Sequence, residues 1–215
     1  IISAETSPDQ PRAAARRVLL DFKKLIPLYL GAAVGPMGGV GIVTLIPVLA
    51  ATWSVDFATA SLAITFYMIP FVAVQLFSGA IAQLFDARKT LLFGFAVYAI
   101  GAILCGLSSG LWFLMGCRAV QGIGAAFLVP IVMALIGELV EERHVGKAMG
   151  LLGMAYTVGV TLGPLLSGLI EVRFGWAGFF YFTAALAVCA GLLYRFSSEP
   201  LPRAGGEAPR ILSVL

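Results

Sequence analysis

The sequence predicts an all-α membrane protein with six transmembrane helices. Hydrophobic residues make up 60% of the 215 residues and charged residues only 12%, whereas soluble domains carry about 25% charged residues. The charged residues cluster in short breaks between long apolar runs. Runs of this length favour helices over the ~10-residue alternating strands of a membrane β-barrel. The mean hydropathy of +0.99 also indicates that lipid surrounds most of the chain.

Six apolar runs are long enough to cross a ~30 Å hydrocarbon core, which needs about 20 residues of helix. In order they are residues 25–51, 57–82, 90–107, 111–137, 148–170 and 176–196. A basic segment, residues 1–24, precedes this bundle of residues 25–196, and a Pro/Gly-rich linker or tail, residues 197–215, follows it. The first run is too long for the apolar region of a cleavable signal peptide.

The distribution of Lys and Arg predicts the orientation of the chain. Twelve of the fourteen basic residues precede the first span, lie at or beyond the end of the last, or lie in the second and fourth connections. The opposite connections carry only Arg173, and Arg118 lies within a span. Because basic loops stay in the cytoplasm, both termini are expected there, in an inner or plasma membrane. This asymmetry accounts for the net charge of +3, so no nucleic-acid partner is expected.

The first three spans resemble the last three. GVGIVTLIP at residues 39–47 and GIGAAFLVP at residues 122–130 share Gly-x-Gly, a Leu and a final Pro. SGAIAQLF at residues 78–85 and SGLIEVRF at residues 167–174 share Ser-Gly, Ile and Phe. Three crossings separate the members of each pair, so the two repeats have opposite orientations. The sequence therefore predicts a 3+3 inverted repeat, which is an architecture of secondary transporters.

Two motifs resemble those of the major facilitator superfamily. In the fourth span, Leu114, Arg118, Gln121 and the Gly-x-Gly that follows are similar to that family's fourth-helix motif. The fifth span is similar to the fifth-helix motif of the family's drug:proton antiporters. Its matching residues are Gly150, Gly159, Gly163, Pro164 and Gly168. The resemblance extends from about residue 25 to residue 196.

This resemblance implies half of a major facilitator fold and a secondary active transporter that works by alternating access. Proton-coupled efflux of small amphipathic or drug-like molecules is the first interpretation. The alternatives are a transporter of a specific metabolite, or a truncated, non-transporting half that only binds or assembles. Its expected partners are a small-molecule substrate, protons, the bilayer, and a second six-helix half or a homodimer. An enzyme is not expected, because the sequence has no nucleophile–base pair, metal cluster or phosphate loop; no cofactor or metal is expected either.

Arg118 is the most informative residue, because a charge at the centre of a membrane helix costs about 2.5–3.5 kcal/mol on insertion scales. It should face the bundle interior, with Gln121 on the same helix face three residues later. The resemblance implies a role in proton coupling. The alternative is a brace that binds backbone carbonyls of the first span. No Asp or Glu lies deep in any span, so the group that exchanges the proton is absent or differs from the usual carboxylate.

Two further sets of residues are candidates. Tyr67, Phe71 and Gln75 share a face of the second span. They either line a substrate cavity or pack against neighbouring helices. In the connection to the third span, Gly79 and Arg88 fit a family motif that latches one conformation by charge pairing, but Gln83 and Asp86 depart from it. The alternative role of Asp86 is to cap the N-terminus of the third helix.

The fifth span has a stripe of small residues, which allows two helix backbones to approach closely. Its members, four residues apart, are Ala155, Gly159, Gly163 and Ser167. The resemblance implies that this helix packs against the other six-helix half; the alternative is packing within one half. Pro164 removes one helical hydrogen bond and allows a bend.

We predict that a membrane-impermeant thiol reagent labels single cysteines placed at Ser54, Ser109 and Gly175 from outside the cell. Cysteines at Arg88 and Lys147 should react only when the membrane is opened, because the basic connections face the cytoplasm. Labelling of the last two in intact cells would reverse the topology.

Overall fold

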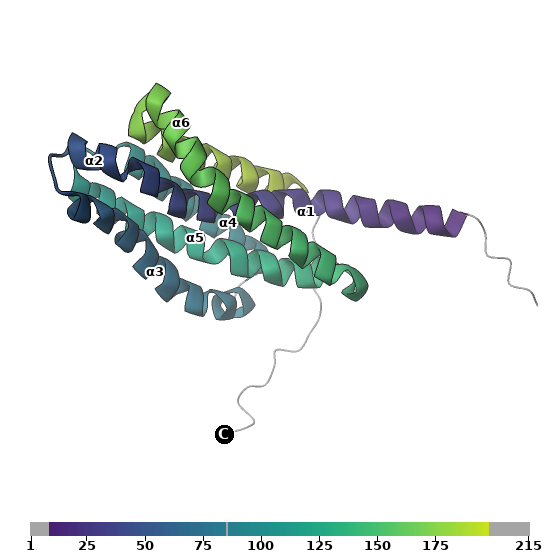
Figure 1. Ribbon diagram of the computed structural model, residues 1–215. Helices are drawn as coiled ribbons and strands as arrows, with labels where there is room; N and C mark the ends of the chain where they lie inside the picture. Colours follow the sequence, from purple (N-terminus) through teal and green to yellow (C-terminus); the bar gives the residue numbers. More distant parts are fainter. Residues whose placement is uncertain (1–8, 85, 198–215) are drawn as a thin grey trace, which may run out of the picture.

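The computed structural model describes the backbone of residues 9–84 and 86–197, and the side chains of residues 25–79, 81 and 86–197. Every described element is helical, which confirms the all-α class (Figure 1). The whole predicted basic segment, residues 1–24, and all but the first residue of the predicted tail fall outside the described side chains. In chain order the elements are α1 (Asp9–Gly41), the 3₁₀ helix η1 (Ile42–Leu45), α2 (Ile46–Thr52), α3 (Phe57–Leu84), α4 (Ala87–Gly106), α5 (Leu111–Leu139) and α6 (Glu142–Ser197).

Among the described residues, five helices or helical runs are long and apolar enough to cross a membrane. The last of them, α6, has 56 residues and contains one residue outside helical geometry, Gly175, with φ 71° and ψ 172°. Such a positive φ favours glycine. The chain folds back here, so α6 consists of two arms that match the fifth and sixth predicted spans (Figure 1). Ala148 and Tyr194, from the far ends of the two arms, lie in one hydrophobic cluster.

The first span is less regular than the sequence predicts. The apolar run that predicts one helix is divided into α1, the short η1 and α2. Pro47 lies in the first turn of α2, where its missing N–H has no helical acceptor to lose. The first span therefore changes its hydrogen-bond pattern between Ile42 and Leu45, within the apolar part of the chain.

Glycines set the spacing of the helices. α5 packs between α3 and α4, and α1 packs against α6. A Cβ on Gly122 would collide with the carbonyl oxygen of Tyr67, and one on Gly163 would lie 2.7 Å from the carbonyl oxygen of Met37. Lipid tails are as apolar as the side chains, so helix association depends on such close van der Waals contact rather than on the hydrophobic effect.

The inverted repeat is also visible in these contacts. Gly41 of the first span and Gly124 of the fourth occupy equivalent positions in the two repeats. A Cβ on Gly41 would collide with Phe179 of the sixth span, and one on Gly124 would collide with the backbone of Tyr98 in the third. Equivalent residues thus contact equivalent helices.

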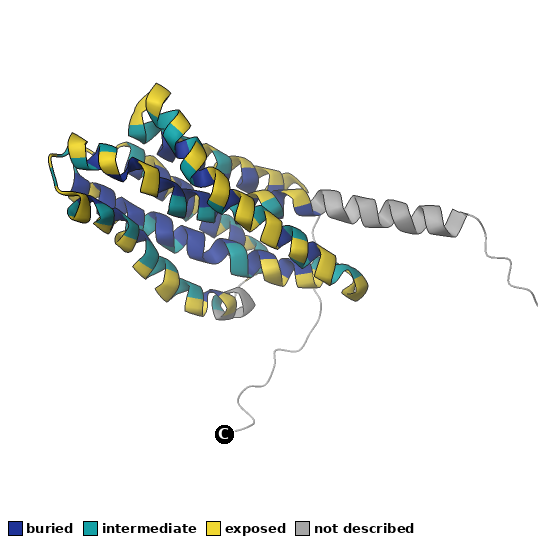
Figure 2. Cartoon of the chain, viewed as in Figure 1, coloured by how far each residue is buried: buried dark blue, intermediate teal, exposed yellow. Residues whose placement is uncertain are grey.

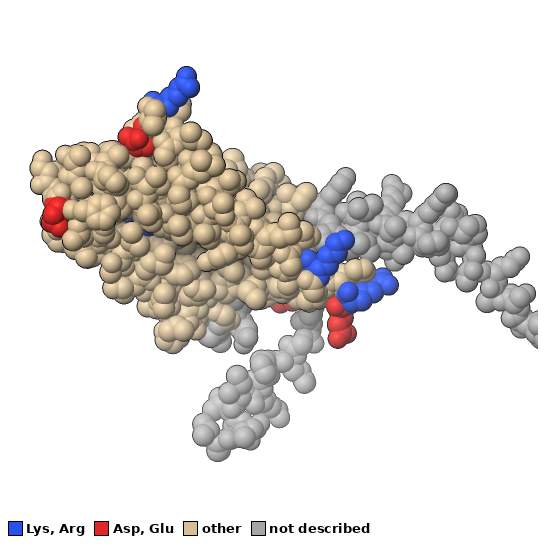
Figure 3. Space-filling model, in the orientation of Figure 1, with Lys and Arg blue, Asp and Glu red and all other residues tan. Residues whose placement is uncertain are grey.

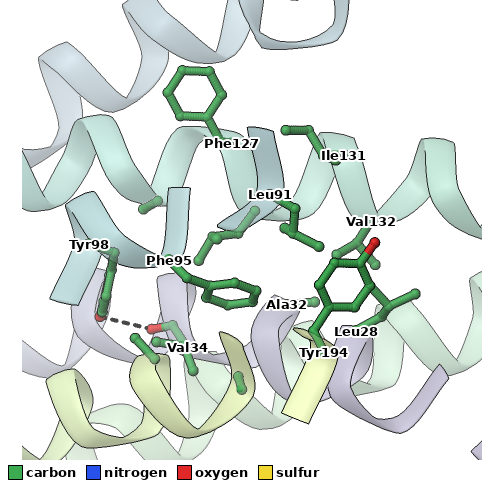
Figure 4. Packing of buried hydrophobic residues seen from close by; sticks show 14 of the residues in the cluster. Leu28, Ala32, Val34, Leu91, Phe95, Tyr98, Phe127, Ile131, Val132 and Tyr194 are labelled. Atoms are coloured by element: carbon green, nitrogen blue, oxygen red, sulfur yellow. Dashed lines mark hydrogen bonds between the residues drawn. The ribbon is translucent and has the colours of Figure 1, made fainter. Parts of the chain in front are cut away.

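The larger hydrophobic cluster has members from all six spans, and most of them lie in the first, third, fourth and sixth (Figure 4). The ring of Phe95 fills the space beside Gly31, where a Cβ would lie 2.8 Å from a ring carbon. The hydroxyl of Tyr98 donates to the carbonyl of Val34 at 3.0 Å, and Figure 4 shows this bond. A buried polar group is therefore satisfied by the backbone of a neighbouring helix, as a membrane interior requires.

Burial is uneven among the spans (Figure 2). In the most apolar window of each span, 61% of the residues are buried in α5 but only 17% in α3. Apart from the buried Arg118, the described charged side chains gather at the ends of the bundle, and the flank seen in Figure 3 carries almost no charge. Many large apolar side chains are exposed along the spans. The exposed apolar surface of a soluble protein would be a liability; here it is the surface that contacts lipid or another membrane helix.

A glycine substitution tests the contact between the first and fifth spans. In Gly159→Ala a methyl group would collide with the carbonyl oxygen of Ala33, whereas Gly153 on the same arm has nothing within 4 Å of a Cβ. Overpacking costs about 1–3 kcal/mol, so Gly159→Ala should lower the midpoint of thermal unfolding in detergent. Gly153→Ala should leave it unchanged or raise it slightly, because Ala favours helix. Equal midpoints for the two variants would show that the contact is absent.

Candidate functional site

Arg118 lies in the middle of the bundle with none of its surface exposed. Its Nη1 donates to the carbonyl of Gly38 at 3.0 Å and its Nη2 to that of Gly39 at 3.3 Å, both in α1. Its Nε donates to the carbonyl of Ala63 in α3 at 3.3 Å. One side chain of α5 therefore binds the backbones of the first and second spans, so the predicted inward orientation is confirmed.

The fourth hydrogen bond of Arg118 runs from Nη1 to Oε1 of Gln121 at 2.7 Å. Because arginine only donates, the amide atom that faces it is the oxygen. The ring of Tyr67 covers the guanidinium, with 4.2 Å between Cζ and the ring centroid. These partners of Arg118 are all neutral: three carbonyls, one amide oxygen and one aromatic face.

Glycines make this arrangement possible. A Cβ on Gly38 would collide with the hydroxyl of Tyr98, and one on Gly39 would lie 2.9 Å from the ring of Tyr67. With no side chains at these two positions, α1 comes close enough for its carbonyls to reach Arg118. The tyrosines complete the packing, since the Tyr67 hydroxyl donates to the carbonyl of Gly35 at 2.9 Å.

The site holds more donors than acceptors. The four hydrogen bonds of Arg118 use four of the five N–H groups of a guanidinium. Nε2 of Gln121 is buried, and the Tyr98 hydroxyl is the acceptor beside it, without a well-formed hydrogen bond. An arginine keeps its charge in a protein, so this group can attract an anion or bias a titration but does not itself exchange a proton.

The face predicted to line a cavity is only partly accessible. Tyr67 is 2% exposed and stacks on Phe71, with 5.9 Å between ring centroids. Phe71 and Gln75 are half-buried further along α3, and Gly79 is exposed. The structure therefore brings Tyr67 into the Arg118 site and leaves Phe71 and Gln75 partly exposed on the same face.

The small residues of the fifth span face the first span. Gly159 and Gly163 pack on the backbone of α1 at Ala33 and Met37, so packing within one half is correct for these two residues, and their predicted contact with a second half is wrong. Because Gly159 and Gly163 contact carbonyl oxygens of α1 directly, no other helix fits between α1 and the first arm of α6. Gly168 lies further along, where a Cβ would be 3.6 Å from Thr44.

The connection between the second and third spans contains a helix cap. The backbone N–H groups of Arg88 and Lys89 donate to Oδ1 of Asp86 at 2.9 and 3.2 Å, which confirms the predicted cap of α4. The cap explains why the third span begins earlier than the apolar run predicts. The side chain of Gln83, the other departure from the family motif, lies outside the described residues.

The acids at the span ends do not approach Arg118. Glu138 is exposed near the end of α5. Asp56 lies in the turn before α3, where the Thr59 hydroxyl at 2.6 Å and the Thr59 N–H at 3.0 Å donate to its carboxylate. These bonds hold the pKa of Asp56 below its ordinary value, so this carboxylate stays ionised at neutral pH and does not suit a proton carrier.

Sequence reasoning missed three contributors to this region: Tyr98, Thr44 and the carbonyl of Ala63. Tyr98 lies in an ordinary apolar run, and a backbone carbonyl has no signature in sequence. Thr44 donates to the carbonyl of Pro164 at 3.0 Å, which links the first span to the fifth. Only the polarity of Thr44 within an apolar run could have drawn attention to it.

Comparisons with known proteins agree with this fold. The sequence matches the Major Facilitator Superfamily over residues 28–214. It is 27% identical over 156 residues to the riboflavin transporter RibZ of Clostridioides difficile, which covers 72% of this chain and 34% of that protein. It is 26% identical over 216 residues to the multidrug resistance protein fnx1 of Schizosaccharomyces pombe, which covers 99% of this chain and 40% of that protein.

A solved structure, that of the proton:xylose symporter XylE, is similar with a TM-score of 0.75. The match covers 83% of this chain and 45% of that one at 14% identity, so it bears on the fold alone. The chain thus spans less than half the length of these three proteins. The family match covers most of its residues, and the chain therefore belongs to the Major Facilitator Superfamily.

Proposed function

We propose that this chain is the amino-terminal half of a proton-coupled exporter of small amphipathic or drug-like molecules. It works by alternating access in a plasma or inner membrane, with both termini in the cytoplasm. Similarity to the multidrug resistance protein fnx1 supports the substrate class. The positions of Lys and Arg along the sequence support the orientation.

The observation that carries this proposal is the burial of Arg118 among neutral partners. A structural ion pair would cancel its charge inside the bundle. Carbonyl dipoles instead satisfy the N–H groups and leave a net positive charge in a region of low dielectric constant. Such a charge lowers the pKa of a carboxylate that approaches it. When the carboxylate withdraws, its pKa rises again. Alternating access supplies the approach and the withdrawal.

The carboxylate comes from outside the described spans in this mechanism. The second six-helix half, or a second copy of the chain, contributes it together with the opposite wall of the cavity. The second half or second copy packs against a surface that includes α3, the least buried span. Ile69 and Leu76 on this helix are 66% and 76% exposed. This surface continues over the outward side of the first arm of α6, opposite Gly159 and Gly163, where Leu165 is 56% exposed.

Transport of one defined metabolite is the second candidate, because the relatives include the riboflavin transporter RibZ. Gln75 is half-buried beside Phe71, and an amide next to an aromatic ring suits a flat heteroaromatic solute as well as a drug. Vesicles that take up riboflavin but no cationic dye under a proton gradient would favour this candidate. Vesicles that take up neither would favour a half that only binds or assembles.

Substitutions of Arg118 separate the coupling role from the brace role. Arg118→Lys keeps the charge but loses the planar donor set, and Arg118→Gln keeps a planar donor but loses the charge. Both leave carbonyls unpaired, at a cost of about 1–3 kcal/mol for each buried group, so both should lower the midpoint of thermal unfolding. In proteoliposomes made with the complete transporter, Arg118→Lys should keep part of the proton-driven dye transport, whereas Arg118→Gln should lose it.

The control for this comparison is counterflow, which exchanges substrate across the membrane without a proton gradient. If charge is used for coupling, Arg118→Gln should retain counterflow at a temperature well below its unfolding midpoint. Equal proton-driven rates for the Lys and Gln variants, scaled only by the fraction folded, would show that Arg118 is a brace and has no coupling role.

A further inference from the structure

Thr44 makes a side-chain hydrogen bond to the backbone of another span. Its side chain is exposed on η1, and its hydroxyl donates to the carbonyl of Pro164 at 3.0 Å. Threonines in the regular helices behave differently. Thr52 donates to the carbonyl of Val48, and Thr157 to that of Gly153, each four residues earlier in its own helix. Thr44 instead donates mainly to another span, and the carbonyl of Gly41 in its own span is further away, at 3.4 Å.

The two helices joined by this bond each have a weak point in their helical hydrogen bonding at the same level. The first span changes to 3₁₀ geometry at Ile42–Leu45. In the fifth span, Pro164 has no N–H to donate to the residue four positions earlier, so this helix can bend there at low cost. The backbones also meet at this level: a Cβ on Gly41 would lie 3.1 Å from the carbonyl oxygen of Gly163.

We propose that the Thr44–Pro164 hydrogen bond is a switchable link that makes the first and fifth spans bend together. The inference rests on the proposed alternating-access function. The bond is formed in the conformation described here and is broken in the opposite one. Movement of α2 about η1 is then accompanied by movement of the first arm of α6 about Pro164. The exposed hydroxyl finds water or its own-turn carbonyl when the link opens, so neither state leaves it unpaired.

The bond is of the right strength for a switch. A neutral hydrogen bond between protein groups shifts an equilibrium by about two- to tenfold, because water or another acceptor competes for the same donor. A link of this size biases the two conformations without locking either of them. The glycine contacts beside it hold the helices together in both states, so loss of the hydroxyl should not unfold the protein.

The test uses the complete transporter with paired spin labels on cysteines at Ala51 and Val172. Both positions are exposed, one on α2 and one beyond Pro164 on the first arm of α6. The exposed native Cys189 is replaced by Ala first, and the two buried cysteines are checked for labelling. Distance distributions in nanodiscs then give the populations of the two conformations without any measurement of transport.

We expect Thr44→Val, which has the same shape without the hydroxyl, to reduce the population that matches this structure about two- to tenfold. Thr44→Ser should restore it, because the donor returns. Thr157→Val is the matched control, since it removes only a bond within its own helix, and it should match the parent. A Thr44→Val distribution that overlays that of Thr157→Val, or a single unshifted distance in every variant, would overturn the proposal.

The outcome is separable from the proposed function. A population shift in Thr44→Val with no proton-driven transport in the parent would keep the link and reject proton-coupled export. Proton-driven transport in the parent with unshifted populations would keep the function and reject the link. Unfolding midpoints of the variants, measured in the same nanodiscs, show whether each protein is folded when its distances are recorded.

Discussion

The bundle is organised around a guanidinium group whose partners among the described side chains include no acid. Arg118 needs acceptors inside the membrane, because each unsatisfied polar group there costs several kcal/mol. It finds them on the backbones of two other spans. Helical carbonyls are reachable only if the helices come very close, which explains Gly38 and Gly39 on the facing side of α1. The charge therefore dictates the spacing of the first, second and fourth spans.

The same spacing rule operates on the other side of the first span, by a different route. There the fifth span has no charge to satisfy, and Gly159 and Gly163 bring its backbone directly onto that of α1. The first span is thus enclosed by short contacts on two sides, one polar and one made of bare backbone. A helix held this closely moves only with its neighbours, or by bending where its hydrogen bonding changes, which is at η1.

Much of this architecture could be predicted from the sequence because lipid imposes simple rules. The number of spans follows from apolar length, and the inward orientation of Arg118 follows from the cost of a charge in lipid. The direction of the small stripe on the fifth span could not be predicted, because Gly159 and Gly163 fit an internal neighbour and a second half equally well. The acceptors of Arg118 were predicted only in part. The brace alternative named backbone carbonyls of the first span, but the particular residues and the second-span carbonyl of Ala63 could not be singled out, since backbone carbonyls are identical in every residue. The change to 3₁₀ geometry at Ile42–Leu45 is indicated in the sequence only by Pro47, which follows it.

The donor surplus at Arg118 gives the site a chemical preference. One N–H of the guanidinium is left over from the four hydrogen bonds of Arg118, and Nε2 of Gln121 has only the Tyr98 hydroxyl as a neighbouring acceptor. A cation that approached would meet a positive charge and no free acceptor, so the site repels it. A carboxylate would meet both a charge and open donors, and charge-assisted hydrogen bonds of this kind are the strong ones. In the proposed mechanism, the conformational change brings the proton-carrying acid up to this surplus, and a cationic drug binds elsewhere, where Phe71 and Gln75 remain accessible.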